Sequence, residues 1–362
     1  MGGPTPRAGL SFTITLIPRP RPPSVHPVVE YVGSAGGDSA TSNTLVFMKT
    51  RRDFVKTTLA LGATLSIVDL SGLFAADASS SPAITPTPTP TGPKPILVAV
   101  RDGDRVAMLD QALAELGGIQ AFVKPGQTVV IKPNIGWNAT PERAANTHPS
   151  LVGHLTALCL SAGAKSVSVF DNTCDQWQET YENSGIGKAA KDAGAIVVNG
   201  KDESLYREVA IPNGTKLKSA KVHSLVLDSD VFINVPVLKH HHATQMTACM
   251  KNLMGIVWDR GAWHRGDLHQ CIADVLTLRK PSLNIIDAYH PMVRNGPRGK
   301  TVDDVVEMRT LLASTDIVAI DAAAAKLLGH QPSEITHIKI AHEMKLGRMD
   351  LENVDIRRHK LT

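Results

Sequence analysis

The chain has 362 residues, of which 43% are hydrophobic and 20% are charged, and its formal net charge is +4. These proportions are typical of a globular protein with a sizeable core. The positive excess is small and dispersed and only 4% of the residues are aromatic, so the composition argues against a nucleic-acid-binding protein. The four cysteines, Cys159, Cys174, Cys249 and Cys271, form no CxxC pair. The sequence therefore contains no iron–sulfur or zinc-ribbon motif.

An export signal is expected over residues 48–78. Arg51 and Arg52 precede an apolar stretch at residues 59–76, and Ala76-Asp77-Ala78 then offers the small residues that a signal peptidase recognises. The paired arginines are typical of the twin-arginine signal, so we expect the twin-arginine translocation machinery as a partner and a periplasmic or extracellular location. Because glycines and an aspartate interrupt the apolar stretch, we expect no stable membrane span after cleavage.

The remaining boundaries follow from composition. Residues 1–47 are rich in Pro, Gly and Ser and predict a disordered upstream extension. Residues 79–95, which alternate Thr and Pro at positions 85–90, predict an extended linker. The folded domain is expected over residues 96–345, with a C-terminal tail at 346–362.

Short apolar runs rich in β-branched residues recur along the folded part and predict strands. They cover residues 96–100, 128–131, 166–170, 195–198, 231–235, 283–286 and 317–320. Helical patterns lie between them at 106–116 and 151–159, each followed by a glycine that ends the helix, and a further helix-like stretch covers 245–254. This alternation predicts a single large α/β domain whose mainly parallel sheet carries helices on both faces.

Polar residues follow these strands where they end. Lys132 and Asn134 close the second run, Asp171 follows the third, Asn234 lies in the fifth and Asp287 follows the sixth. Because the carboxyl ends of parallel strands face one crevice, we expect these side chains to converge on a ligand site. The alternative for any one Asp or Asn is a turn or helix-capping role.

A second group of polar residues predicts an anion site. Lys239 precedes the helix-like stretch, and Lys251 and Asn252 lie on it. Basic side chains and free backbone N–H groups at the start of a helix favour a phosphate or a carboxylate. Together with Lys132 they are expected to bind a small anionic ligand.

Histidines support two further hypotheses. His240 and His241 suit proton transfer near neutral pH. His242, His264 and His269 could ligate a divalent metal, since neutral imidazole is a common metal ligand. No HExxH spacing supports this metal site. The sequence therefore leaves two alternatives open, a divalent metal cofactor or no metal cofactor.

Three methionines recur at helical spacing and admit two interpretations. Met246, Met250 and Met254 stand four residues apart. Such a stripe can serve a soft metal or a haem, but it is more typical of core packing, which we expect here.

Several motifs together resemble a known family. They are Val130-Ile131-Lys132-Pro133-Asn134, Thr147-His148-Pro149, Ile233-Asn234-Val235-Pro236-Val237-Leu238-Lys239, Met250-Lys251-Asn252-Leu253-Met254-Gly255 and Ile285-Ile286-Asp287-Ala288. Over roughly residues 96–345 the chain resembles the domain-of-unknown-function family 362 (DUF362). The resemblance implies the α/β fold, the site location and frequent export by the twin-arginine route. Some members carry an added ferredoxin-like segment with clustered cysteines; this sequence has no such cluster, so no iron–sulfur cofactor is expected.

The functional hypothesis is an exported enzyme that acts on a small anionic substrate, with or without a divalent metal. Lys132, Lys239 and Lys251 would hold the anion, Asp171 and Asp287 would act as ligands or acid–base groups, and the histidines would transfer protons or ligate the metal. Two alternatives stay open: a non-catalytic binding protein for a small anion or metal, and a protein associated with redox or electron transfer.

Overall fold

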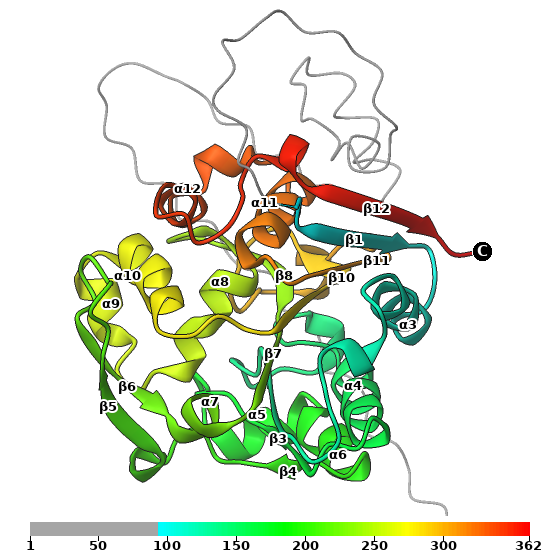
Figure 1. Cartoon of the computed structure of the whole chain (residues 1–362), viewed down its shortest axis with the longest axis horizontal. Coiled ribbons are helices and arrows are strands. Elements are labelled where there is room, and N and C mark those ends of the chain that lie inside the picture. Colours follow the sequence, from blue (N-terminus) through cyan, green and yellow to red (C-terminus); the bar gives the residue numbers. More distant parts are fainter. Residues whose placement is uncertain (1–92) are drawn as a thin grey trace, which may run out of the picture. The chain divides into compact units, whose positions relative to one another are not determined.

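In the computed structural model, which describes residues 93–362, the apolar runs supply most strands of one ten-stranded sheet (Figure 1). The upstream extension, the export signal and almost all of the linker lie outside the described residues. The main path of the sheet runs through β12 (Asp355–Lys360), β1 (Ile96–Arg101), β11 (Thr310–Ser314), β10 (Leu283–Met292), β7 (Val231–Val235), β2 (Thr128–Pro133), β3 (Ser166–Val169) and β4 (Ile196–Val197). Off this path, β8 (Val237–His241) pairs with β10, and β9 (Gln245–Thr247) pairs with β8.

Most neighbouring strands of this sheet are parallel. β2 runs parallel to both β7 and β3, and β10 runs parallel to β7 and β8. β11 is the exception on the main path, since it is antiparallel to both β1 and β10. The predicted class, a mainly parallel α/β sheet, is confirmed.

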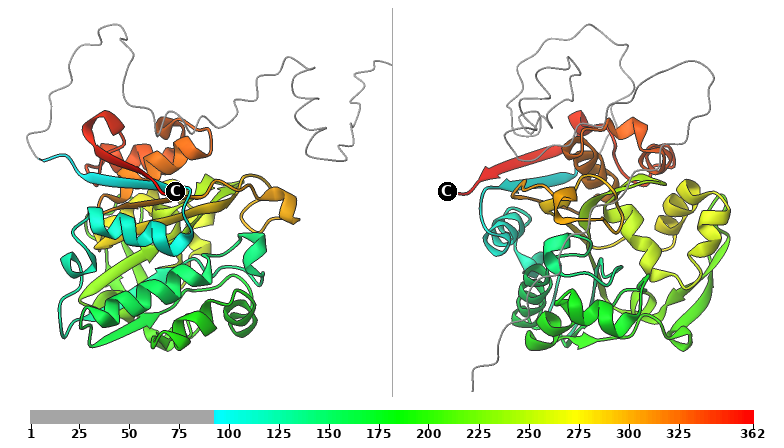
Figure 2. Two further views of the ribbon diagram at one scale, coloured as in Figure 1. Left: turned by 90° about the vertical axis from the view of Figure 1, so that its right-hand side faces the viewer. Right: turned by 180° about the vertical axis from the view of Figure 1, so that it is seen from behind.

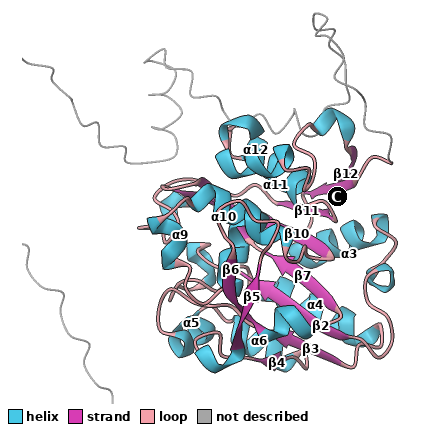
Figure 3. Ribbon diagram, turned by 60° about the vertical axis from the view of Figure 1, so that its left-hand side comes forward, coloured by secondary structure: helices cyan, strands magenta, loops and turns pink. Residues whose placement is uncertain are grey.

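Helices cover both faces of the sheet (Figures 2 and 3). One core cluster includes buried residues of α3 (Arg105–Glu115), α4 (Pro149–Ser161), α5 (Trp177–Asn183) and α6 (Ile186–Asp192). The other includes buried residues of α8 (Cys249–Asn252), α10 (Leu268–Asp274), α11 (Ile317–Leu327) and α12 (Thr336–Glu343). Successive residues of β1 show the division, because Leu97 belongs to one cluster and Val98 to the other, as strand geometry requires.

The remaining elements are short. β5 (Tyr206–Ala210) and β6 (Ser219–His223) form a separate antiparallel pair. α7 (Ser224–Asp228) and α9 (Gly261–Arg265) are two further α-helices of the described residues. Within residues 93–362 we find no helix that combines the length and the apolar character needed to cross a bilayer.

The two helices predicted between the first strands are confirmed, and their ends have local causes. Asp104 caps α3 by accepting hydrogen bonds from the backbone N–H groups of Val106 and Ala107. His148 caps α4, and Pro149 occupies its first position, where a missing N–H costs nothing.

The strand predicted at residues 317–320 is wrong. These residues begin α11, and the strand of this region is β11, which ends at Ser314. The side chain of Asp316 accepts from the backbone N–H groups of Val318 and Ala319, which starts the helix, and alanines continue it. A short apolar run buried on all sides does not distinguish strand from helix by its pattern.

The single helix predicted at 245–254 is also wrong. Gln245–Thr247 forms β9, which pairs with β8 through a tight hairpin, and Cys249–Asn252 then forms the single turn of α8. A 3₁₀ turn, η4 (Leu253–Ile256), completes the segment. The prediction that the three methionines pack in the core is confirmed, because Met246, Met250 and Met254 are all buried.

The structure also extends the folded domain beyond residue 345. The predicted tail at 346–362 contains β12, which runs parallel to β1 with Ile356 opposite Leu97. The sequence of β12 is strongly charged because the strand lies at the edge of the sheet, where charged residues are usual, and this composition hides its β character.

Deleting residues 355–362 should therefore destabilise the fold rather than trim a tail. Loss of β12 leaves the backbone of β1 unpaired along one side, so we expect the free energy of unfolding to fall by about 1–3 kcal/mol. Urea unfolding measures this difference. Removal of Thr362 alone is the control, and an unchanged unfolding midpoint in the larger deletion would contradict the role assigned to β12.

Candidate functional site

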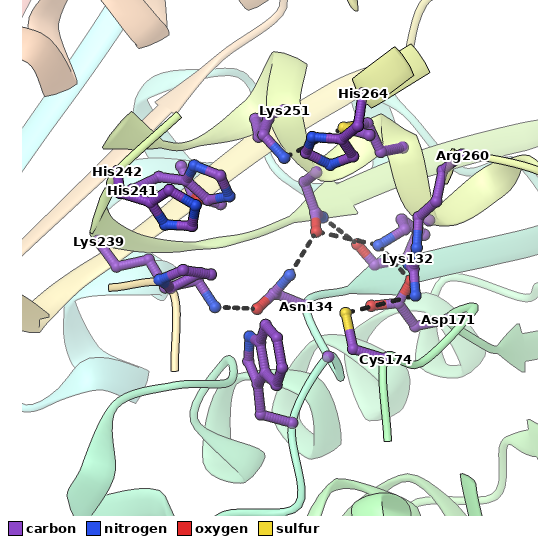
Figure 4. Close-up of a pocket in the computed structure, with 17 residues that line it drawn as sticks. Lys132, Asn134, Asp171, Cys174, Lys239, His241, His242, Lys251, Arg260 and His264 are labelled. Atoms are coloured by element: carbon purple, nitrogen blue, oxygen red, sulfur yellow. Dashed lines mark hydrogen bonds and ion pairs between the residues drawn. The ribbon is translucent and has the colours of Figure 1, made fainter. Parts of the chain in front are cut away.

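A cavity of about 230 Å³ lies where β2 and β3 end, walled by β8, α8 and η4 (Figure 4). Nine of the residues predicted for the site line it. They are Lys132, Asn134, Asp171, Lys239, His241, His242, Lys251, Asn252 and His264. The parallel strands thus bring residues more than one hundred positions apart in the sequence to the same cavity.

An ion pair between Lys132 and Asp171 forms the floor of the cavity. Lys132 is fully buried, and its Nζ lies 2.7 Å from Asp171 Oδ1. The same ammonium donates to the carbonyl oxygen of Pro133 and to Asn252 Oδ1, each at 2.9 Å. Burial lowers the pKa of Lys132, while the Asp171 carboxylate acts in the opposite direction. Three acceptors surround the three N–H groups of a protonated Lys132, so this side chain is held by contacts within the protein and offers no free donor to a ligand.

Asn252 connects this pair to the rest of the site. Its Oδ1 accepts from Lys132 and, at 3.1 Å, from Asn134 Nδ2. Its Nδ2 donates to Asn234 Oδ1 at 2.8 Å, and Asn234 in turn donates to the carbonyl oxygen of Cys249 at 3.0 Å. Asn234 does not line the cavity. It instead holds α8 in place through its contacts with Asn252 and with the backbone of Cys249. The prediction that Asn234 binds substrate is therefore not supported by its position.

Lys239 has only neutral partners. Its Nζ donates to Asn134 Oδ1 at 2.8 Å and to the carbonyl oxygen of Ala145 at 2.5 Å. Burial is the main cause that lowers the pKa of this amine to about 7. No carboxylate of the described chain contacts it, so its positive charge lacks a direct counterion.

Lys251 is the least satisfied amine of the cavity. Its side chain is almost fully buried, and its Nζ lies 3.1 Å from the thioether sulfur of Met254, a weak acceptor. Burial lowers its pKa to about 8, and the nearby Arg260 guanidinium acts in the same direction.

Arg260 and Cys174 are among the cavity residues that were not predicted. The Arg260 guanidinium donates to the carbonyl oxygens of Asn172 and Thr173 and, at 3.3 Å, to Cys174 Sγ. Cys174 stands three residues after Asp171 in the same loop, so its position near a strand end was the available signal. Arg260 lies in the loop between Trp258 and Trp263. The two tryptophans indicated a loop that lines a pocket or anchors itself on the core, but no pattern assigned a role to the guanidinium.

Two of the cavity histidines, His241 and His264, have lowered pKa values. The rings of His241 and His242 stack with centroids 5.0 Å apart. Burial and the nearby Lys251 lower the pKa of His241 to about 2, and burial also lowers the pKa of His264. A base this weak is poorly matched to proton transfer near neutral pH, which argues against the acid–base role predicted for His241.

Two predicted catalytic residues lie outside the cavity. Asp287 is buried in an ion pair with Arg105 at 3.1 Å and accepts from the backbone N–H of His148 at 3.1 Å. His240 Nδ1 accepts from the backbone N–H of Gly296 at 3.1 Å. The prediction that they share the opening with Lys132 is wrong, because each is held by structural contacts of its own.

The three histidines proposed as metal ligands do not converge. His242 and His264 line the cavity, but His269 stacks on His337 with ring centroids 5.6 Å apart. Across residues 93–362, no three His, Cys, Asp or Glu side chains are grouped so that they could hold a metal ion. The residue set therefore does not fit the predicted metal site.

Gly255 allows α8 and η4 to approach the ion pair. A Cβ atom at this position would overlap Asp171 Oδ1 and would lie 2.7 Å from Lys132 Nζ. Only a residue without a side chain fits there, which gives a physical reason for the glycine that ends the Met250–Gly255 motif.

Fold and cavity together define a class, an α/β protein with a small cationic cavity at the carboxyl ends of its parallel strands. The chain belongs to the family described as Domain of unknown function (DUF362), whose model matches residues 129–326. The family resemblance predicted from the motifs is confirmed.

A curated relative supports this assignment. The chain is 28% identical over 253 residues to a thylakoid-associated protein of Synechocystis, covering 68% of this chain and 76% of the relative.

Two solved structures share a weaker likeness. The lactate racemase apoprotein of Thermoanaerobacterium thermosaccharolyticum matches with a TM-score of 0.38 and 11% identity, over 69% of this chain and 57% of that one. A Thermotoga maritima protein matches with a TM-score of 0.38 and 12% identity, over 67% of this chain and 59% of that one. This chain thus spans less than two thirds of either structure.

Replacing Gly255 by Ala should damage the floor of the cavity. The added methyl group must displace Asp171 or η4, so we expect a loss of stability of about 2–4 kcal/mol, the range of overpacking and of a disrupted buried ion pair. Gly136→Ala is a matched control in the same cavity, because a Cβ there meets nothing closer than 3.8 Å. Thermal unfolding compares the two variants, and equal melting temperatures would contradict this account.

Proposed function

We propose that the protein is an exported enzyme that binds a small anionic substrate in the cavity at the ends of β2 and β3. One observation carries this proposal: the cavity is lined by Lys132, Lys239, Lys251 and Arg260 but by a single carboxylate. That carboxylate, Asp171, is already paired with Lys132. The other cations therefore remain available to a ligand.

The energetics of burial support an anionic occupant. Burying a cation without a counterion is costly, and Lys239 and Lys251 are both nearly inaccessible to solvent. A bound carboxylate or phosphate would supply the missing negative charge and form charge-assisted hydrogen bonds with these amines. In the ligand-free protein the cost is limited because burial lowers the pKa of Lys239 to about 7 and that of Lys251 to about 8, so both amines can lose their charge near neutral pH.

The size of the cavity restricts the ligand. Its volume of about 230 Å³ lies below the range of about 300–1,000 Å³ usual for drug-sized ligands. The cavity therefore favours a small carboxylate or phosphate over a nucleotide.

The pKa values of Lys239 and Lys251 favour catalysis over binding alone. Burial lowers the pKa of Lys239 to about 7 and that of Lys251 to about 8, which suits proton transfer near neutral pH. A pure binding protein would use the same amines without turnover, and saturable binding without product formation would identify it.

Anion binding should weaken as the pH rises. Sulfate keeps one charge state from mildly acidic to alkaline pH, whereas Lys239 and Lys251 lose their protons as the pH passes about 7 and about 8. At about pH 6, sulfate near one hundred times its Kd should raise the melting temperature by roughly 5 °C, and this shift should shrink strongly by about pH 9. A shift that is constant or grows with pH would contradict the assignment of these lysines.

Replacing either amine by a methionine should separate function from stability. Lys251→Met removes a buried charge that lacks a counterion, so the ligand-free protein should gain stability on the order of 1 kcal/mol. Lys239→Met leaves Asn134 Oδ1 and the carbonyl oxygen of Ala145 without this donor, so a loss of about 1 kcal/mol is expected. Both should lose the sulfate-induced shift. Lys188→Met is the matched control, since Lys188 is exposed and pairs with Asp192 on the surface. Variants that lose stability yet keep the shift would indicate a structural role.

We also propose export by the twin-arginine route, on the basis of the sequence of residues 48–78. Changing Arg51 and Arg52 together to Lys should leave the protein in the cytoplasm of its exporting host, because the twin-arginine translocation machinery recognises the arginine pair. Cell fractionation and immunoblotting measure the distribution. Changing Arg7 and Arg19 to Lys is the control with the same chemistry, and equal distributions for both double variants would refute the proposal.

A further inference from the structure

The three lysines of the cavity differ in what each ammonium group contacts. Lys132 contacts a carboxylate and two further oxygens. Lys239 contacts two neutral oxygens, and Lys251 contacts the sulfur of Met254. A protonated amine has three N–H groups and needs strong acceptors, whereas a neutral amine has a lone pair to offer. The surroundings of Lys251 are therefore the least suited to a permanent ammonium and the most suited to a reacting amine.

We propose that Lys251 forms an imine with the carbonyl carbon of a small carbonyl acid, such as a 2-oxo acid or an aldehyde acid. This inference rests on the proposed anion site and names the substrate class of that site. The carboxylate of the substrate would occupy the cationic side of the cavity, and its carbonyl group would meet the amine.

Hydrogen bonds to neighbouring residues fix the backbone position of Lys251. It lies on the single turn of α8, and the fully buried carboxylate of Asp321 accepts from the backbone N–H groups of Cys249 at 2.7 Å and Met250 at 2.9 Å. Asn252 of the same turn is held by Asn234. With the backbone anchored on both sides, the side chain of Lys251 extends to the cavity wall near His264 (Figure 4).

The electrostatics of the cavity support the same role. Burial and the Arg260 guanidinium lower the pKa of Lys251 to about 8, so a useful fraction of the amine is neutral near physiological pH. Desolvation and neighbouring cations are the usual means by which proteins activate a lysine nucleophile. Protonated Lys239 can donate a hydrogen bond to the carboxylate of the substrate, because its two acceptors in the protein occupy only two of its three N–H groups.

The step balances without a further reagent. The lone pair of Nζ attacks the carbonyl carbon, a C–N bond forms, and the electron pair of the C=O π bond moves to oxygen. The C–O bond of this carbinolamine then breaks, and the oxygen leaves as water with the two protons that the neutral amine carried.

Reductive trapping tests the proposal on the full-length protein. Glyoxylate with sodium cyanoborohydride converts an imine on Nζ into a stable carboxymethyl-lysine, which peptide mass spectrometry locates. Near neutral pH, Lys251 should be modified about 10-fold faster than exposed Lys188, and sulfate should suppress the difference. Acetaldehyde, which lacks the carboxylate, should show a smaller preference for Lys251. Lys251→Arg keeps a cation but has no primary amine, and it should lose the fast modification.

Modification of Lys251 no faster than that of Lys188 would overturn the imine, whatever sulfate does. If the sulfate-induced thermal shift persists in that case, the anion site stands and only the covalent step is lost. If the shift is absent as well, both proposals fail. Preferential modification of Lys239 would also overturn the assignment, because the reacting amine would then be a different one.

Discussion

The buried ion pair between Lys132 and Asp171 is the interaction on which the rest of the site depends. It joins the ends of two parallel strands, and both partners also contact neighbouring backbone, through the carbonyl oxygen of Pro133 and the N–H of Ile135. Breaking such a pair leaves an uncompensated charge in the core, which costs more than a surface contact. The absence of a side chain at Gly255 lets the next layer of the site close over it.

From this floor, a chain of amide contacts determines where the free cations lie. Asn252 contacts Lys132 and Asn134, and Asn134 in turn contacts Lys239. The polar network is therefore satisfied around Lys132 and becomes progressively less satisfied toward Lys251. One cavity therefore contains a lysine whose contacts stabilise the fold, Lys132, and two lysines whose amines can bind a ligand or react, Lys239 and Lys251.

Much of the fold followed from local pattern. Runs of β-branched residues between glycine-terminated helices predicted β1, β2, β3, β4, β7 and β10, together with α3 and α4. Prediction failed where local pattern is ambiguous: α11 begins with an apolar run that is buried on all sides, and β12 is charged because it lies at an edge. The segment at 245–254 was misread because its methionines keep helical spacing although a hairpin strand occupies its first part.

The sequence by itself determined the family, the parallel sheet and the strand ends at which polar side chains gather, since strand direction alone brings those ends to one edge. Only the tertiary structure decided which polar residues share the cavity. Asp287 was predicted to follow a strand as Asp171 does, yet it lies within β10, where Arg105 of α3 pairs with it outside the cavity. Arg260 reaches the cavity from a loop distant in sequence. Such choices depend on which partner each buried charge finds across the fold, and no local pattern encodes that partner.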